Sequence, residues 1–85
     1  MVARILYNQN SPSARQAQDF ARELADLRVE TELVEANSPE GISLTELYDL
    51  ASRPAVVLLR NDGQMMERWL HELPLASDVS YLAHS

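Results

Sequence analysis

Cysteine and lysine are both missing from this chain, and glycine occurs only twice. Without cysteine there is no disulfide, no thiolate metal ligand and no thiol nucleophile. Each of the seven basic residues is therefore an arginine. The longest uninterrupted apolar run, 54–59, is far too short to span a bilayer. These absences exclude thiol chemistry and argue against a membrane-spanning helix.

What remains is the composition of a small globular domain. The 85 residues are 46% hydrophobic and 24% charged, and 13 acidic against 7 basic side chains give a formal charge of −6. This charge opposes binding to nucleic acids and anionic membrane surfaces, because the arginines are spread along the chain rather than clustered. Strand-like sequence begins almost at Met1 and leaves no room for a signal peptide. We therefore expect one cytoplasmic domain, residues 1–85.

The spacing of apolar residues predicts the element order β-α-β-α-β-β-α, which is an α/β arrangement. Turn-forming residues separate the elements, including Pro74 before the last helix and the hairpin sequence Asn61-Asp62-Gly63. The predicted strands cover 3–8, 28–35, 55–59 and 64–69, and the predicted helices cover 13–27, 43–52 and a short segment that begins at Ser77.

Capping residues predict where two of the helices begin. Ser11, which a proline follows, is a candidate N-cap of the helix 13–27, and Ser13 offers a competing capping box. Ser43 and Glu46 form a capping box that predicts the start of the second helix.

The predicted core lies around the segment 55–59, which is apolar on both faces and therefore central in a sheet. The helix 13–27 has an apolar stripe that includes Phe20 and Leu24. We expect a single buried cluster in which this helix packs across the first and third strands. Its main members are Ile5, Phe20, Leu24, Val57 and Leu59.

The element order, an Arg53-Pro54 dipeptide directly before the third strand and the tight hairpin after it together resemble the thioredoxin-like superfamily. The short chain looks most like glutaredoxins, and the stretch 6–15 also looks like the N-terminal domain of glutathione transferases. The resemblance implies a four-stranded mixed sheet in the order 2-1-3-4 with helices on both faces and two parallel βαβ connections. It also implies a cis peptide bond at Arg53-Pro54, facing the loop at Ser11.

The chain departs from this family at the positions that carry its chemistry. Ser11 and Ala14 stand where thioredoxin-like proteins have the two ends of a Cys-x-x-Cys or Cys-x-x-Ser motif. The Glu-Ser pair of glutathione transferases is matched only approximately by Glu67-Arg68. We therefore expect the family scaffold without thiol–disulfide oxidoreductase activity, and we assign no catalytic residue, metal or cofactor.

The resemblance places a ligand groove between the loop after the first strand and the residues before the third strand. The corresponding positions here are Ser11, Pro12, Ser13, Arg53 and Pro54. An extended peptide bound there would pair with the backbone beside Pro54. The leading hypothesis is a redox-inactive domain that binds a protein or peptide.

A second hypothesis is a domain that binds glutathione or another small thiol, as the glutathione transferase resemblance implies. Ser11 would donate a hydrogen bond to the thiolate of the ligand, and Tyr7 stands where some transferases have a catalytic tyrosine. Each residue has a simpler explanation, Ser11 as an N-cap hydroxyl and Tyr7 as a half-buried strand aromatic. A structural role through self-association is a third possibility, so the oligomeric state is left open.

Met65, Met66 and Trp69 form a candidate interaction patch on the last strand. Regular alternation predicts Met65 and Trp69 on one side of the sheet and Met66 on the other. The patch is either core packing at the sheet edge or an adaptable apolar surface for a partner. The two histidines, His71 and His84, are expected to be surface residues outside any metal site.

Overall fold

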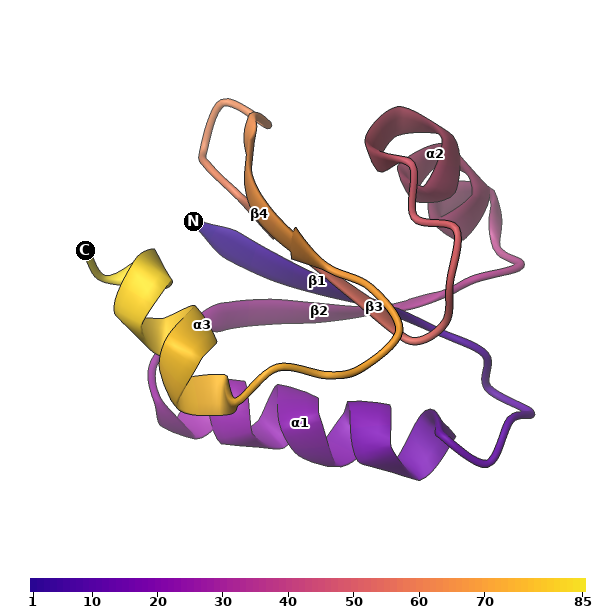
Figure 1. Ribbon diagram of the computed structural model, residues 1–85, viewed down its shortest axis with the longest axis horizontal. Coiled ribbons are helices and arrows are strands. Elements are labelled where there is room, and N and C mark those ends of the chain that lie inside the picture. The colour runs from indigo at the N-terminus through magenta and orange to yellow at the C-terminus, as the bar shows by residue number, and fades with distance from the viewer.

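The computed structural model describes all residues 1–85 and contains the predicted order of elements (Figure 1). The strands are β1 (Val2–Tyr7), β2 (Glu30–Glu35), β3 (Ala55–Leu59) and β4 (Met65–Trp69), and the helices are α1 (Ala14–Asp26), α2 (Pro39–Tyr48) and α3 (Ala76–Ala83). None of the helices is long and apolar enough to cross a membrane.

The four strands form one mixed sheet in the order β2-β1-β3-β4, as the resemblance implies. β1 runs parallel to β2 and antiparallel to β3, and β3 runs antiparallel to β4. The expectation of two parallel βαβ connections was therefore wrong, because only β1-α1-β2 joins parallel strands. The segment from β2 through α2 to β3 joins antiparallel strands on opposite sides of β1.

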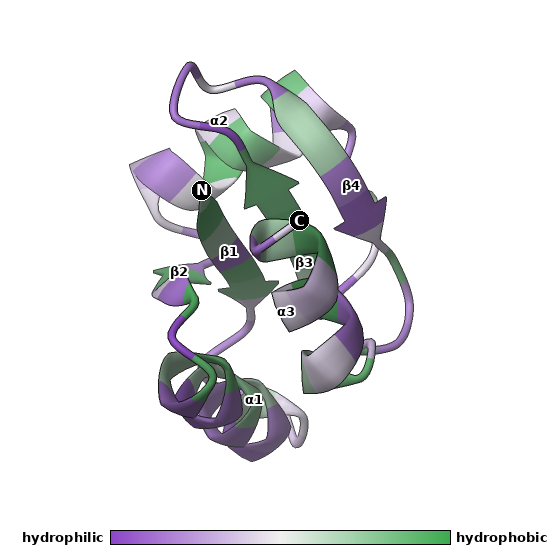
Figure 2. Cartoon of the chain, turned by 90° about the vertical axis from the view of Figure 1, so that its left-hand side faces the viewer, coloured by the Kyte–Doolittle hydropathy of each residue, from purple (hydrophilic) through white to green (hydrophobic).

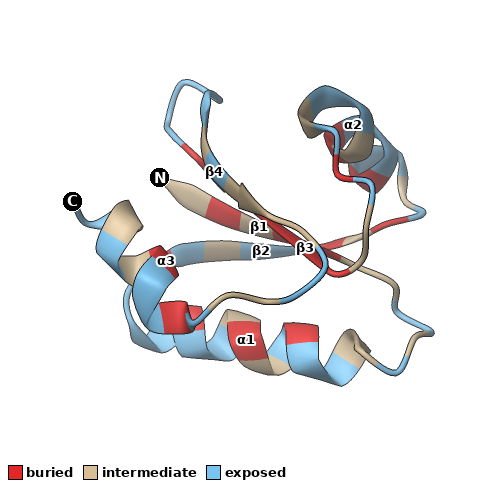
Figure 3. Ribbon diagram, in the orientation of Figure 1, coloured by how far each residue is buried: buried red, intermediate tan, exposed pale blue.

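The helices cover both faces of the sheet (Figure 1), with α1 and α3 on one face and α2 on the other. The buried side of α1 faces the strands, and its outer side is exposed (Figure 3). The outer side of α1 is also hydrophilic, whereas β3 is hydrophobic throughout (Figure 2). The sheet therefore separates two hydrophobic clusters.

The expectation of a single core was wrong in one respect. Ile5, Phe20 and Leu24 belong to the cluster under α1, as expected. Val57 and Leu59 are equally buried, but they belong to the cluster under α2. Side chains alternate along a strand, so Val56 and Leu58 of β3 face α1, whereas Ala55, Val57 and Leu59 face α2.

The chain before α1 differs from the predicted start of this helix. The N-cap position is Ser13, and the Ser11 hydroxyl does not cap the helix. The Ser11 main-chain oxygen instead accepts a hydrogen bond from the Ala14 N–H at 3.1 Å, within a turn that precedes α1. The two serine hydroxyls bond to each other at 2.8 Å, and neither makes a side-chain capping hydrogen bond.

α2 begins earlier than the capping box at Ser43 and Glu46 predicts. Its N-cap is Ser38, whose Oγ accepts a hydrogen bond from the Gly41 N–H at 3.0 Å. The first turn packs closely on the end of β2, because a Cβ at Gly41 would collide with the main-chain oxygen of Glu35. The side chains of Ser43 and Glu46 are instead exposed on the outer face of the helix.

β4 carries an irregularity that changes which side chains face the core. Leu58 pairs with Glu67 but Leu59 pairs with Met65, so Met66 is an extra residue of a β-bulge. As a result Met66 packs with Trp69 against the cluster under α1, whereas Met65 is 39% exposed. The predicted pairing of Met65 with Trp69 on one side was therefore wrong. α3 begins at Ala76 after Leu75, not at a Ser77 cap.

β2 is one of the two edge strands, and its surface is acidic. Glu30 and Glu32 are exposed, and Glu35 at its end is half-buried. Arg4 on the neighbouring strand lies 3.9 Å from the Glu32 carboxylate and 3.4 Å from Glu40 on α2. The outer edge of β2 is therefore open to solvent.

Candidate functional site

Pro54 lies where β1, β3 and β4 reach the same end of the sheet. β3 pairs with β1 up to Leu6–Ala55 and with β4 up to Val56–Trp69. Pro54 precedes these pairs on β3, His71 follows them after β4, and both line the same pocket. The Arg53–Pro54 peptide bond is cis.

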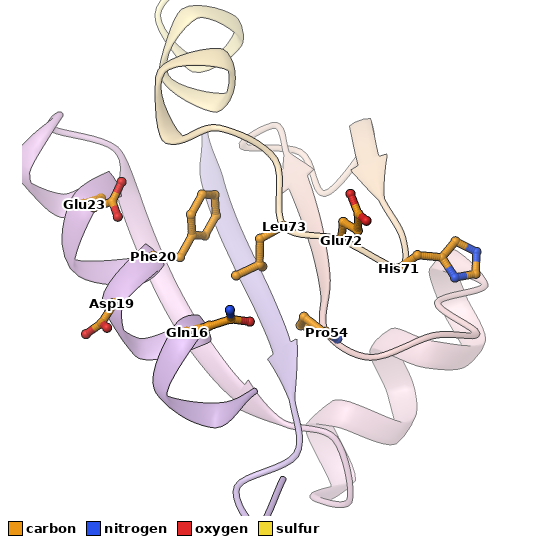
Figure 4. A pocket seen from close by; sticks show the side chains of 8 residues that line it. All are labelled: Gln16, Asp19, Phe20, Glu23, Pro54, His71, Glu72 and Leu73. Atoms are coloured by element: carbon orange, nitrogen blue, oxygen red, sulfur yellow. The ribbon is translucent and has the colours of Figure 1, made fainter. Parts of the chain in front are cut away.

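Pro54 lies at one end of an open groove of about 580 Å³ between α1 and the connector from β4 to α3 (Figure 4). Phe20 of α1 and Leu73 of the connector approach each other across it, and Gln16 points toward Pro54 (Figure 4). We call this the Pro54 groove, and its lining residues are Gln16, Asp19, Phe20, Glu23, Pro54, His71, Glu72 and Leu73.

The rim of the Pro54 groove is acidic. The Asp19 carboxylate forms ion pairs with two arginines of the same helix, at 3.8 Å from Arg15 and 3.4 Å from Arg22. Glu23 and Glu72 are both exposed, and their carboxylates take part in none of the hydrogen bonds or ion pairs of the structure. Two unpaired negative charges therefore stand beside an apolar floor.

Arg53, expected to line the ligand groove, precedes Pro54 but is not among the residues that line the Pro54 groove. Its Nη1 donates hydrogen bonds to the main-chain oxygens of Leu50 at 2.6 Å and Ser52 at 3.1 Å, and its Nη2 donates to Thr45 Oγ1 at 3.0 Å. The side chain thus lies against the end of α2. The main-chain N–H and C=O groups of Arg53 and Leu73 have no intramolecular backbone partner.

The connector holds His71 in an unusual backbone conformation. Its φ is +74°, in the left-handed region that non-glycine residues seldom occupy. The His71 N–H donates to Ser52 Oγ at 2.8 Å, which ties the connector to the segment before Pro54. His84, expected to be a surface residue, is exposed and has Nε2 3.1 Å from the main-chain oxygen of Leu27.

The loop residues expected to line a ligand groove lie apart from the Pro54 groove. Ser11 belongs to a separate polar pocket of about 380 Å³ beside Glu35. The Glu35 carboxylate accepts hydrogen bonds from the main-chain N–H groups of Gln9 at 2.7 Å and Asn37 at 3.1 Å. Pro12 is exposed and Ser13 half-buried, and neither lines a pocket.

Tyr7 and the candidate patch on β4 contribute mainly to packing. Tyr7 is half-buried against the cluster under α1, as are Met66 and Trp69. Only Met65 of the patch is exposed, and its exposed fraction is 39%. No group of three or more His, Asp or Glu side chains is arranged to hold a metal ion.

Sequence reasoning placed Pro54 in the site but missed the groove walls. His71 was expected only to be a surface residue, and no sequence pattern singles out Glu23 or Glu72. No local pattern joins these residues, because 48 positions separate His71 from Glu23. They become neighbours only when the connector passes α1.

The geometry defines a thioredoxin-like fold in a chain without cysteine. No family model and no curated protein sequence matches the chain. Solved structures do: thioredoxin 1 from Thermosipho africanus has a TM-score of 0.73 at 14% identity, over 99% of this chain and 91% of that one. A malarial protein has a TM-score of 0.73 at 19% identity, over 95% and 90% of the two chains.

A thioredoxin from Thermus thermophilus is also similar, with a TM-score of 0.64 at 22% identity over 98% of this chain and 71% of that one. Identities at this level show a shared fold. The thioredoxin-like architecture is therefore confirmed, and the chain contains no cysteine.

Proposed function

We propose that this chain is a redox-inactive thioredoxin-like domain that binds an extended segment of a protein partner in the Pro54 groove. The observation that carries the proposal is the groove itself, which combines an apolar floor with main-chain groups that lack backbone partners, at Leu73 in the lining and at Arg53 directly before Pro54. Unpaired main-chain donors and acceptors beside apolar pockets suit recognition of an extended peptide.

The conformation of His71 supports the same location. Left-handed backbone at a non-glycine residue costs about 1 kcal/mol or more and tends to occur at binding sites. The other two non-glycine residues with positive φ, Arg28 and Asp49, lie just after helices, where such a conformation ends the helix. His71 ends no helix and lines the groove.

Peptide selection with a blocked groove tests the proposal. Peptides enriched from a displayed random library are titrated into ¹⁵N-labelled protein, and we expect amide shifts at Gln16 and at 71–73. Gln16→Trp fills the groove and should abolish binding. Gln18→Trp, on the outer surface of the same helix, should leave binding unchanged.

Two results would contradict the proposal. One is a set of peptides whose shifts map to β4 or α2 and whose affinity Gln16→Trp does not change. The other is a library from which no peptide is enriched against the unmodified chain.

A further inference from the structure

We infer that the segment bound in the Pro54 groove is cationic, presenting an arginine or lysine beside an apolar side chain. This inference rests on the proposed function and names the chemistry of its ligand. It depends on the placement of charge around the groove, which the fold alone does not determine.

The apolar part of the ligand would lie on the floor of the groove. Phe20 and Leu73 face each other there, with Pro54 at one end (Figure 4). Phe20 is buried and Leu73 half-buried, so the floor is shallow and firmly packed. An aliphatic side chain that covers it would remove apolar surface from water.

The charged part of the ligand would meet Glu23 and Glu72. These residues stand on opposite walls, with Phe20 and Leu73 between them (Figure 4). Both carboxylates are exposed and unpaired, so a cation gains their attraction without breaking an existing ion pair. A side chain lying on the floor would have one carboxylate on either side.

The remaining charges near the groove do not reverse its preference for a cationic ligand. Arg15 and Arg22 are paired with Asp19 on α1, and the Arg53 guanidinium lies against α2. His71 is the only other titratable group in the lining. The formal charge of −6 adds a long-range field that repels acidic segments and speeds the approach of basic ones.

A matched set of peptides tests the inference. The probe is an acetylated Pro-Val-Leu-Arg-Leu-Val-Pro peptide, and its two counterparts carry citrulline or glutamate in place of arginine. Each is titrated into ¹⁵N-labelled protein, and Kd is taken from the shifts at Gln16 and 71–73. We expect the arginine peptide to bind at least about fivefold more tightly than the citrulline peptide, and the glutamate peptide more weakly than either.

Variants that neutralise one carboxylate at a time show which glutamates contribute to the affinity for the arginine peptide. Glu23→Gln and Glu72→Gln should each weaken the arginine peptide by about two- to fivefold, and the double variant should bind arginine and citrulline peptides alike. Glu46→Gln is the control, because it changes the net charge equally from an exposed position on α2. Added salt should reduce the preference for arginine.

The outcomes separate this inference from the proposed function. If all three peptides bound in the groove with the same Kd, the preference for a cationic ligand would be overturned, and the proposal of peptide binding would stand. If Glu46→Gln weakened the affinity for the arginine peptide as much as Glu23→Gln does, the inferred role of the groove carboxylates would also be overturned, because the effect would then come from net charge. Absence of groove shifts with every peptide would contradict both.

Discussion

Arg68 on β4 donates a hydrogen bond from Nη1 to the main-chain oxygen of Tyr48, at the end of α2, over 2.8 Å. The same nitrogen lies 2.9 Å from the main-chain oxygen of Asp49, the αL C-cap residue. The guanidinium of Arg53 binds the next carbonyl, that of Leu50. Two arginines thus satisfy carbonyls that the end of a helix leaves unpaired.

We predict that Arg68→Ala lowers the free energy of unfolding by roughly 1 to 2 kcal/mol, because carbonyls at the end of α2 lose a charged donor. Arg68→Lys should recover only part of the loss, since an ammonium lacks the planar fork of a guanidinium. Urea denaturation measures the change. Arg60→Ala removes an exposed arginine without side-chain hydrogen bonds and should change little; equal losses would contradict the prediction.

Gly41→Ala should destabilise the protein by more than 1 kcal/mol, because its Cβ would meet the main-chain oxygens of Glu35 and Ala36. The matched control is Ser43→Ala, an exposed position of the same helix where alanine favours helix formation. Thermal melts of the two variants provide the comparison. A neutral Gly41→Ala would mean that α2 moves away from β2 without cost.

The two hydrophobic clusters should respond independently. Leu24→Ala in the cluster under α1 is expected to cost about 2 to 5 kcal/mol, and Val57→Ala in the cluster under α2 somewhat less. The double variant should show the sum of both losses if it still folds, since the sheet separates the sites. Leu47→Ala, at a side chain that is 71% exposed, is the control. A mild effect of Leu24→Ala in denaturant titrations would place the α1 stripe outside the core.

A thiol introduced at Ser13 should have a lower pKa than one introduced at Ser11. Ser13 is the N-cap of α1, where the helix dipole stabilises a thiolate, whereas Ser11 lies in the preceding turn. Thiolate absorbance during a pH titration of Ser13→Cys and Ser11→Cys gives the order. The reverse order would show that the helix begins nearer Ser11.

Glutathione at millimolar concentration should leave the amide signals of Ser11 and Ala55 unchanged. The Ser11 hydroxyl is paired with Ser13, and the carboxylate of Glu35 beside it repels an anionic ligand. A heteronuclear titration checks this expectation. Saturable shifts at Ser11 would instead favour the small-thiol hypothesis.

The order of the elements was predictable because it depends on local signals: apolar spacing, turn residues and the Asn61-Asp62-Gly63 hairpin. The start of α2 could not be predicted in the same way, because Ser38 and Ser43 are both suitable N-cap residues. The helix begins at Ser38, where Gly41 in its first turn packs closely against the end of β2. The face of the sheet on which Val57 lies could not be predicted from the sequence either. A strand that is apolar at every position gives no alternation from which to infer a side.

The site was less predictable than the fold for a related reason. The bulge at Met66 adds a residue that alternation does not anticipate, and it reverses which methionine meets Trp69. The groove depends on the path of the connector past α1. That path brings Glu72 and Glu23 to opposite walls, and neither residue belongs to a motif.

The glutamates of β2 have a consequence for how molecules of this chain behave together. If two copies aligned their open edges, Glu30 and Glu32 of one would face like charges of the other, and such juxtaposition is unfavourable. Charged side chains along an unpaired edge strand are a common protection against edge-to-edge pairing of sheets. The protein should therefore resist edge-to-edge aggregation, and this protection should weaken at high salt, where the charges are screened.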